Sequence, residues 1–478
     1  YPFIMMTLIQ AVREGNSTLI KELLEKGEED VNQVERVGKD TLKWTALHIA
    51  CQDGHADIVE LLLQHGANVN AKTNDGDFTP LHFTDEEDIA MMLLDKGADL
   101  EAKDDEGQTP LITACQFSRE FVQLLLDRGA NMEARGDTGK TPLHIAASGN
   151  DLLIINLLLD RGADLEACNN NNGKTPLHIA CSQGHTPQER IPLLFFGPGA
   201  DLESRNVHSG SLRASRYLLS RGANLEARNN DGDTPLHVAS VESTSELVEL
   251  LMDQGANLDA PNEDGDTPLH KVCKNLNSES GIEHARLLLD RGANVDARNN
   301  VGCTPLHLAG SLEAARLLLD RDANVDARNN DGCTPLHLVG KAYSARLLLD
   351  RGASLEARNN DGFTVLHIAC SDRNIEAARF LLDRGATLEA VDKHDKTPLH
   401  TACSDGNMDV VSFLLNRGAD LEAANNMGLR PLHYAVLNNW PRVARLLLDR
   451  RAIVDSTTLA RTTPLSFACQ KGHVEIVW

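Results

Sequence analysis

Residues 231–260 read DGDTPLHVASVESTSELVELLMDQGANLDA, and variants of this pattern return throughout the chain. Thr followed by Pro favours a helix start, because Thr caps the first turn and Pro is tolerated at the first helical position. A polar turn then leads to a second amphipathic segment, ELVELLMDQG, which stops at Gly255. Each repeat is therefore predicted to be a pair of short helices, joined to the next pair by a tight turn rich in Asn, Asp and Gly.

The Thr-Pro-Leu-His string marks one position in every repeat. Most neighbouring anchors lie 30 to 37 residues apart, whereas one gap measures 59 residues, which we interpret as two periods with one anchor lost. With residues 8–27 as a degenerate opening repeat, the chain holds about fifteen repeats. One helix pair cannot bury its apolar face alone, so neighbouring pairs must stack. The anchor positions are Thr45, Thr79, Thr109, Thr141, Thr175, Thr234, Thr267, Thr304, Thr334, Thr364, Thr397, Arg430 and Thr463.

The stretch 231–260 resembles the ankyrin repeat almost position for position, and the resemblance extends from residue 8 to residue 478. It implies an all-α fold, an ankyrin-repeat solenoid of stacked helix pairs with β-hairpin fingers projecting from one edge. It also implies a non-catalytic scaffold that binds other proteins through the finger tips and the concave helix face. No cofactor is expected.

The charge balance excludes some classes of partner. Lys and Arg number 46 against 70 Asp and Glu, which gives a net charge of −24. Binding of nucleic acid or of an anionic membrane surface depends on concentrated positive charge, so neither is expected. The sequence has no run of 18 apolar residues, so we expect no membrane insertion. We expect a monomer in the cytoplasm, with the nucleus as the other compartment open to it.

Histidine and cysteine follow the repeat. Eleven of the 18 His residues occupy the fourth position of the anchor string, and seven of the ten Cys residues end the first helix. One such residue per repeat places neighbours about 10 Å apart, too far for shared zinc ligation or a disulfide. In the family that the chain resembles, this His bonds to the Thr of its own repeat. The sequence therefore predicts no metal site and no catalytic residue, and reduced thiols suit an intracellular compartment.

The regular pattern breaks after Ser182. Pro187 and Pro192 enter an expected second helix, and FFGPGADLES (195–204) replaces the usual end of a repeat. This segment is either drift in a tolerant array, or a flexible joint or partner pocket that uses Phe195 and Phe196. The predicted divisions are a degenerate repeat and connector (1–44), N-terminal repeats (45–181), irregular or eroded repeats (182–228) and C-terminal repeats with an incomplete last one (229–478). Three repeats, anchored at Thr79, Thr304 and Thr334, are shortened to 30 residues, and we expect this to trim the turn between their two helices.

The C-terminal half carries the predicted partner-binding residues. In ankyrin repeats, which this chain resembles, the residue before the anchor points outward and often contacts a partner. Along this half, the residues that precede the anchors change from acidic to apolar. Aligned exposed apolar side chains often mark an interface. The acidic pair favours a partner with a basic rim. The predicted binding residues are Asp233, Asp266, Cys303, Cys333, Phe363 and Leu429, with Val301 and Met427 at neighbouring tip positions.

Asn70 is a candidate for modification. In LLLQHGANVNAK it occupies the position that ankyrin-directed asparaginyl hydroxylases modify, an expectation that comes from the resemblance alone. Most other repeats carry Glu or Asp there, such as Glu101 and Asp296. The other interpretation is an ordinary turn Asn.

Two further functions stay open beside the interaction scaffold. One is a regulatory or substrate-recruiting arm of a larger protein, such as a ligase, an immune receptor or a channel. The other is a secreted, host-directed effector. Because the sequence starts at Tyr1 and stops at Trp478 within an expected second helix, we expect the natural chain to continue. The sequence names neither the partner nor the source.

Overall fold

The helices begin and end where the repeat pattern predicts. The hydroxyl of Thr175 caps a first helix by accepting the His178 N–H at 3.5 Å, and Pro176 occupies the first helical position. A second helix ends at Gly222, whose φ of +94° lies in the left-handed region that glycine adopts freely. The computed structural model describes residues 7–27, 30–37, 42–74, 76–84, 86–182, 207–275, 279–338 and 342–477.

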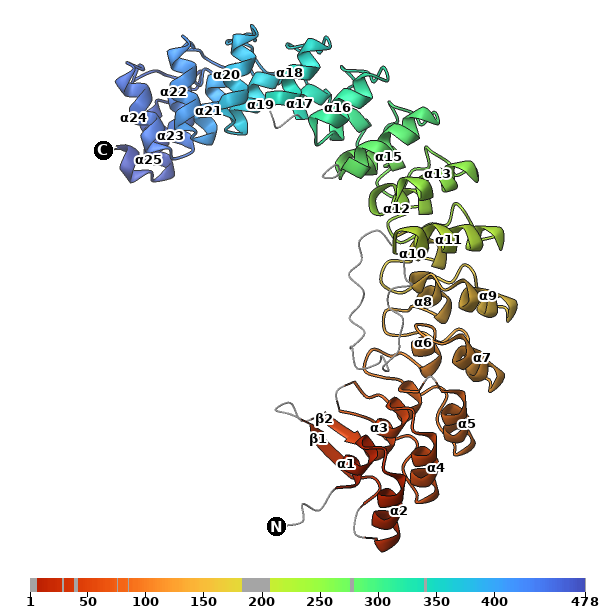
Figure 1. Cartoon of the computed structure of the whole chain (residues 1–478). Coiled ribbons are helices and arrows are strands. Elements are labelled where there is room, and N and C mark those ends of the chain that lie inside the picture. Colours follow the sequence, from red (N-terminus) through yellow and green to blue (C-terminus); the bar gives the residue numbers. More distant parts are fainter. Residues whose placement is uncertain are drawn as a thin grey trace. The chain divides into compact units, whose positions relative to one another are not determined.

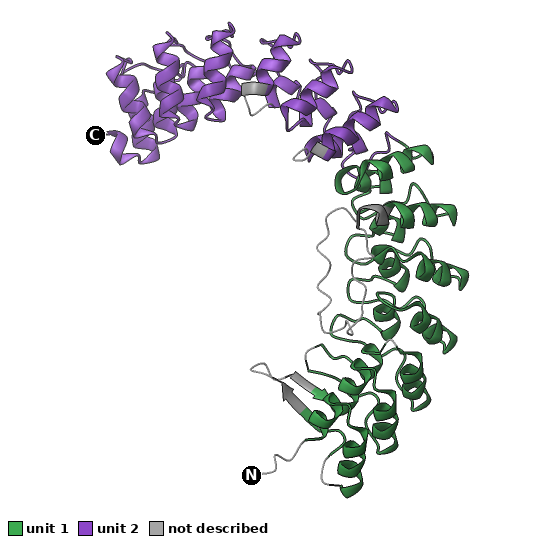
Figure 2. Ribbon diagram, viewed as in Figure 1, with its two compact units in different colours: residues 1–257 green, residues 258–478 purple. Residues whose placement is uncertain are grey.

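The chain divides into two compact units, residues 1–257 and 258–478 (Figure 2). Unit 1 is a row of helix pairs with one two-stranded sheet (Figure 1). Its elements are α1 Leu8–Arg13, α2 Ser17–Lys26, β1 Val34–Val37, β2 Leu42–Thr45, α3 Ala46–Gln52, α4 Ala56–Gln64, η1 Pro80–His82, α5 Glu87–Asp95, α6 Pro110–Ala114, α7 Arg119–Asp127, α8 Pro142–Gly149, α9 Leu152–Asp160, α10 Pro176–Cys181, α11 Val207–Ser220, α12 Pro235–Glu242 and α13 Ser245–Asp253.

Unit 2 is built in the same way, and its described residues are helices and loops. Its elements are α14 Pro268–Lys274, α15 Glu279–Asp290, η3 Pro305–Leu308, α16 Leu312–Leu319, α17 Pro335–Leu338, α18 Ala342–Asp350, α19 Val365–Ser371, α20 Ile375–Asp383, α21 Pro398–Asp405, α22 Met408–Asn416, α23 Pro431–Leu437, α24 Pro441–Asp449, α25 Pro464–Lys471 and α26 Val474–Val477.

First helices pack on first helices, and second helices pack on second helices. In unit 1, α10 contacts α8 and α12, while α11 contacts α9 and α13 (Figure 1). The buried side chains between them are mainly Leu, Ile, Val, Ala and Cys, as the composition predicts. The core therefore repeats with the sequence period, and the all-α ankyrin solenoid predicted from the sequence is confirmed.

The 59-residue gap between anchors is one repeat with an insertion, not two repeats. Helices α10 and α11 pack on each other as the two helices of a single repeat. The His178 Nε2 atom then reaches the backbone O of Asp233 at 3.0 Å, which directly precedes the next anchor. The prediction of a repeat that lost its anchor is therefore wrong. Residues 183–206, including Phe195 and Phe196, lie outside the described residues, and the predicted division at 182–228 stays a prediction.

The three short repeats differ from the expectation of a trimmed turn, because their first helices are short. The first helices that follow Thr79, Thr304 and Thr334 are only three or four residues long: η1, η3 and α17. In the other described repeats after the opening one, the first helix has five to eight residues. Loss of three residues from the period therefore shortens the first helix itself, and not only the turn that follows it.

The fingers are mostly tight turns rather than strand pairs. Among the described residues, only β1 and β2 form an antiparallel ladder, with Val34 opposite Thr45. A later finger closes through a single backbone hydrogen bond at its base, from the Asn229 N–H to the Asp233 O at 3.1 Å. Only three residues lie between those two positions, which leaves no room for a longer ladder.

Candidate protein-binding face

Each finger is held by one side chain at its base. In the finger of residues 359–363, the Asn359 Oδ1 atom accepts the backbone N–H groups of Asp361 at 3.0 Å and Phe363 at 2.9 Å. Gly362 takes a φ of +82°, a conformation that side chains rarely adopt. Successive fingers are also joined, because the Asn360 N–H donates to the Asp331 O at 2.9 Å. The tips are therefore rigidly placed.

In the residue before each anchor, both the backbone N–H and the backbone carbonyl are hydrogen-bonded. The backbone N–H of Cys303 donates to Asn299 Oδ1 at 2.9 Å, and its carbonyl accepts from the Nε2 atom of His270 in the preceding repeat at 3.0 Å. The same pair of bonds holds Leu429, through Asn425 and His400. This position lies between one finger and the next, where the neighbouring repeat covers it.

The predicted outward orientation of this row is therefore wrong for most of its members. Phe363 is half-buried, with its ring centroid 5.5 Å from that of His367. The remaining side chains are buried against the next finger: Asp233, Asp266, Cys303, Cys333 and Leu429. Burial also raises the pKa of the Cys333 thiol. These side chains pack the fingers together, and a contact role for them with a partner stays a prediction.

The acidic pair does not form an exposed rim. The Asp266 carboxylate is 1% exposed and lies 2.6 Å from Lys274 Nζ and 2.8 Å from Asn299 Nδ2. Lys274 and Asn299 stabilise its charged form and hold its pKa below the usual value, although burial alone would raise it. The Asp233 side chain is buried as well. A basic partner therefore does not meet these carboxylates on the surface.

The two tip positions are exposed as predicted. Val301 is 58% exposed and Met427 is 62% exposed. The backbone O of Val301 accepts the Asn330 N–H, and that of Met427 accepts the Leu459 N–H, both at 3.0 Å. These apolar side chains gain nothing from folding, yet the backbone beneath them is fixed.

The anchor histidines are structural. In the repeat of Thr141, the His144 Nδ1 atom accepts the Thr141 hydroxyl at 2.8 Å, and its Nε2 atom donates to the Lys174 O at 3.0 Å. The bond to Thr was predicted, whereas the second bond, which reaches the following repeat, was not. Burial lowers the pKa of His144 to about 4, so the ring is neutral. A group of three or more acidic, His or Cys side chains placed to hold a metal ion is not found in the described ranges.

Asn70 joins two repeats. Its Oδ1 atom accepts the Asp99 N–H at 2.8 Å, and its Nδ2 atom donates to the Gly97 O at 3.1 Å. Glu101 and later acidic residues at this position accept the corresponding N–H, for example from Asn131 at 2.7 Å. The position therefore selects for a side-chain acceptor. The opening repeat has a second Asn in the same place, Asn32, which accepts the Asn68 N–H at 2.7 Å.

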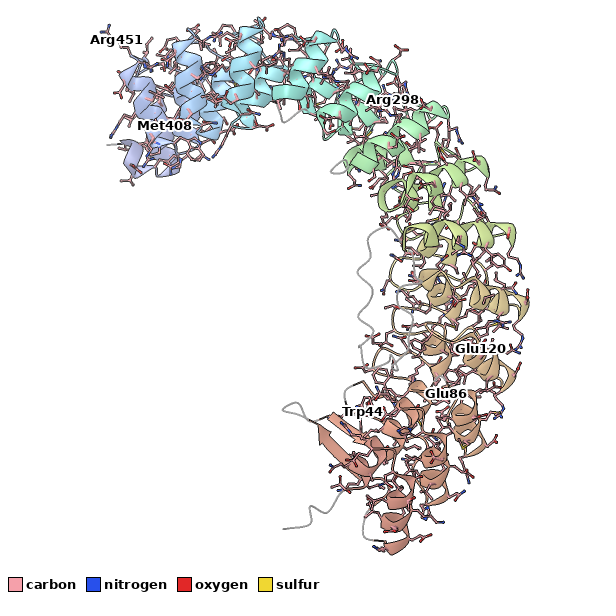
Figure 3. The ribbon with its side chains drawn as sticks, in the orientation of Figure 1. Trp44, Glu86, Glu120, Arg298, Met408 and Arg451 are labelled. Carbon is pink, nitrogen blue, oxygen red and sulfur yellow. The ribbon has the colours of Figure 1, made fainter. Side chains whose placement is uncertain are left out.

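Some exposed side chains on this face were overlooked in the sequence. Arg298, Arg328 and Arg358 follow one another at a single register, and Leu338 at the end of α17 is 45% exposed. Arg298 is labelled in Figure 3. The recurring segments DARNN and EARNN and the 30-residue spacing were visible signals. The 30-residue spacing was interpreted only as a trimmed turn.

Parts of the chain are similar in sequence to parts of known proteins. Residues of the chain are 46% identical over 71 residues to mouse BCL-6 corepressor-like protein 1, covering 15% of this chain and 4% of that protein. They are 39% identical over 77 residues to human protein phosphatase 1 regulatory subunit 27, covering 16% of this chain and 46% of that protein. Mouse 2-5A-dependent ribonuclease is 46% identical over 70 residues, covering 15% of this chain and 9% of that protein.

In each of these relatives the chain therefore matches less than half of the length. The described part of the chain also has no helix with the length and apolar character that a bilayer crossing requires. The family model for ankyrin repeats matches in overlapping stretches that together run from residue 8 to residue 478. The chain belongs to the ankyrin repeat family.

Proposed function

We propose that this protein is a non-catalytic scaffold that binds partner proteins through the finger tips and the first helices of its C-terminal half. Ankyrin repeats generally mediate protein–protein interaction, and the family is typically non-enzymatic. The observation that carries the proposal is the pair of exposed apolar tips, Val301 and Met427, on fingers that hydrogen bonds hold in place. Preorganised apolar side chains lose little entropy on binding.

A regulatory or recruiting arm of a larger protein is the second candidate. The relatives include proteins named as a corepressor-like protein and as a regulatory subunit of a phosphatase. The matched repeats cover only part of each of them. In this alternative the same face selects the partner, and the attached domains supply the effect.

An affinity purification with matched variants tests the proposal. Tagged wild-type chain is compared with the double variant Val301→Lys and Met427→Lys, and with the control Leu448→Lys, which changes an exposed apolar side chain on the second helix α24. We expect the double variant to lose proteins that the wild type and the control both retain. Equal retention by all three chains would contradict a role for the finger tips.

We also propose that Asn70 is hydroxylated in cells that contain an ankyrin-directed hydroxylase. Support comes from its position and its exposure. Its two bonds to the next repeat oppose modification, so the reaction requires this loop to open locally. Peptide mass spectrometry after enzyme treatment should show one added oxygen on the Asn70 peptide. An unmodified Asn70 peptide would contradict this proposal. The peptide that contains Asn32, which occupies the same position in the opening repeat, is the control for whether the sequence around Asn70 is required.

A further inference from the structure

Two neighbouring short repeats leave apolar side chains uncovered in unit 2. Helices η3 and α17 have four residues each, whereas the flanking first helices α14 and α19 have seven. After η3 the chain enters α16 almost at once, because Ser311 caps α16 by accepting the Ala314 N–H at 3.1 Å. Leu338, the last residue of α17, is 45% exposed, and Leu308, the last residue of η3, is half-buried.

A row of three arginines runs along the fingers of the same repeats. Arg298, Arg328 and Arg358 are exposed, and within the described ranges none of them lies within ion-pair distance of a carboxylate. Three other arginines of unit 2 behave differently. Arg321, Arg351 and Arg384 at the ends of the second helices pair with the Asp of the preceding repeat, at 2.6 to 3.0 Å.

Two of the three arginine side chains are fixed in place. The Arg298 Nη1 atom donates to the backbone O of Arg328 at 2.7 Å, and the Arg358 guanidinium donates to the backbone O of Val391. Asn amides join the fingers beside them, because Asn330 Nδ2 donates to the Asn300 O at 3.0 Å and Asn360 Nδ2 donates to the Asn330 O at 2.8 Å. The guanidinium groups of Arg298 and Arg358 are therefore held in place, and Arg328 occupies the same register in the repeat between them.

The row lies beside the short helices. Burial lowers the pKa of His307 in η3, and the positive charge of Arg298 lowers it further. Burial and the charge of Arg328 act in the same way on His337 in α17. The geometry agrees, because the Arg358 Nη1 atom donates to the Gly362 O at 3.4 Å, and the carbonyl of the next residue, Phe363, accepts from His337 in α17 at 3.1 Å. Arg298, Arg328, Arg358, Leu308 and Leu338 together are called the short-helix face below.

Most nearby carboxylates are already engaged. Asp296 and Asp326 accept backbone N–H groups of the following repeats, from Asn324 at 3.0 Å and from Ser354 at 2.9 Å. Asp361 is paired with Lys393. Asp296 and Asp326 keep their negative charge in these bonds, and Asp331 at the middle tip adds another. An acidic ligand must therefore lie on the helix side of the tips, next to the guanidinium groups.

We propose that the short-helix face binds an acidic peptide segment of another protein, with one apolar residue of that segment packed on Leu308 and Leu338. Guanidinium groups form paired hydrogen bonds with carboxylates, and regularly spaced ones select acidic side chains of an extended segment. Elsewhere the strongly acidic chain repels such a peptide, which restricts binding to this face. The inference rests on the proposed scaffold function and names the chemistry of its partner.

Selection from a phage-displayed library of short random peptides on the full chain tests this inference. We expect the selected peptides to be rich in Asp and Glu around a Leu, Ile or Phe. The triple variant Arg298→Gln, Arg328→Gln and Arg358→Gln should weaken their binding about tenfold, as three exposed ion pairs are lost. The control triple Arg286→Gln, Arg316→Gln and Arg346→Gln removes the same charge from α15, α16 and α18 and should leave the affinity nearly unchanged.

Three results would overturn the inference: no enriched peptide, enrichment without acidic residues, or equal weakening by both triple variants. The scaffold function has a separate readout in the affinity purification above. Basic or purely apolar peptides that bind the Val301 and Met427 tips would refute the short-helix face while leaving that function intact. Loss of binding in Leu338→Gln, with the unfolding midpoint unchanged, would locate the apolar contact.

Discussion

At the residue scale, one hydrogen-bond pattern decides which side chains are exposed. The bond from the anchor Thr to the His three residues later was predictable from the recurring string. The bond from that His to the next repeat was not, because a period does not reveal what the neighbouring finger covers. The second bond holds the residue before the next anchor inside the stack, as His337 holds Phe363 at 3.1 Å. The repeat pattern therefore identifies the exposed tips but gives the wrong orientation for the residues that precede the anchors.

The exceptional anchor gives a residue-scale prediction. Arg430 replaces the usual Thr, and its Nε atom lies 3.4 Å from Glu422 Oε2 in a partly buried pair. Arg430→Thr restores a hydroxyl for His433 Nδ1 and for the helix start, while Glu422 keeps the Ile453 N–H at 2.8 Å. We expect the free energy of unfolding of the C-terminal repeats to rise by about 1 kcal/mol.

Urea unfolding followed by circular dichroism measures this change. Arg445→Gln, on an exposed position of α24, is the control and should have little effect. A destabilised Arg430→Thr chain would show that the ion pair contributes more than the missing hydroxyl.

The anchor histidines predict how stability depends on pH. Burial lowers the pKa of His82, His144, His178 and His400 to about 4, from an ordinary value of 6.5. Between these values the unfolded chain binds more protons, so stability is complete above about pH 6.5 and falls as the pH drops towards 4. Each group contributes at most about 1.4 kcal/mol per pH unit.

Asp104 acts in the opposite direction, because burial raises its pKa to about 6, and burial also raises the pKa of Glu166, Glu389 and Asp405. Burial lowers the pKa of nine anchor histidines, which outnumber these four carboxyls. The urea midpoint should therefore be lower at about pH 5 than at about pH 7. His144→Gln should reduce this dependence on pH. Equal midpoints at the two pH values would contradict the neutral, doubly bonded histidines.

At the scale of elements, the period predicts regular helix pairs well and interruptions badly. Anchors 30 residues apart correctly indicated short repeats, because fewer residues leave a shorter first helix. The 59-residue gap led to the wrong prediction of two repeats, because an insertion and a lost first helix both lengthen the spacing between anchors. The segment FFGPGADLES also looks like the end of a repeat. Only the packing of α10 on α11 separates the two interpretations.

Deletion of residues 183–206 tests the single-repeat interpretation. Since α10 and α11 pack on each other and on both neighbouring repeats, a short Gly-Ser connection should preserve the fold. We expect the helical circular dichroism per residue and the urea midpoint to stay close to those of the full chain. A chain that loses one cooperative transition, or aggregates, would instead indicate that the deleted residues belong to a repeat of their own.

At the scale of the whole molecule, the sequence predicts the class of function better than the site. Composition and period point to an acidic, aliphatic repeat protein, and the family match confirms its class. The exposed positions depend on contacts between repeats, which no single repeat contains. That is why Val301 and Met427 were identified from the sequence while Arg298, Arg328, Arg358 and Leu338 became apparent only in the structure.

The central claim is that partner proteins bind the fingers and first helices rather than the second helices. Site-specific photo-crosslinking tests it most directly, with benzoylphenylalanine placed at Val301 in one chain and at Arg316, on the second helix α16, in another. In an extract of cells that produce the protein, the claim predicts specific crosslinked proteins from position 301 and none of them from position 316. The same proteins crosslinked equally from both positions, or only from position 316, would contradict it.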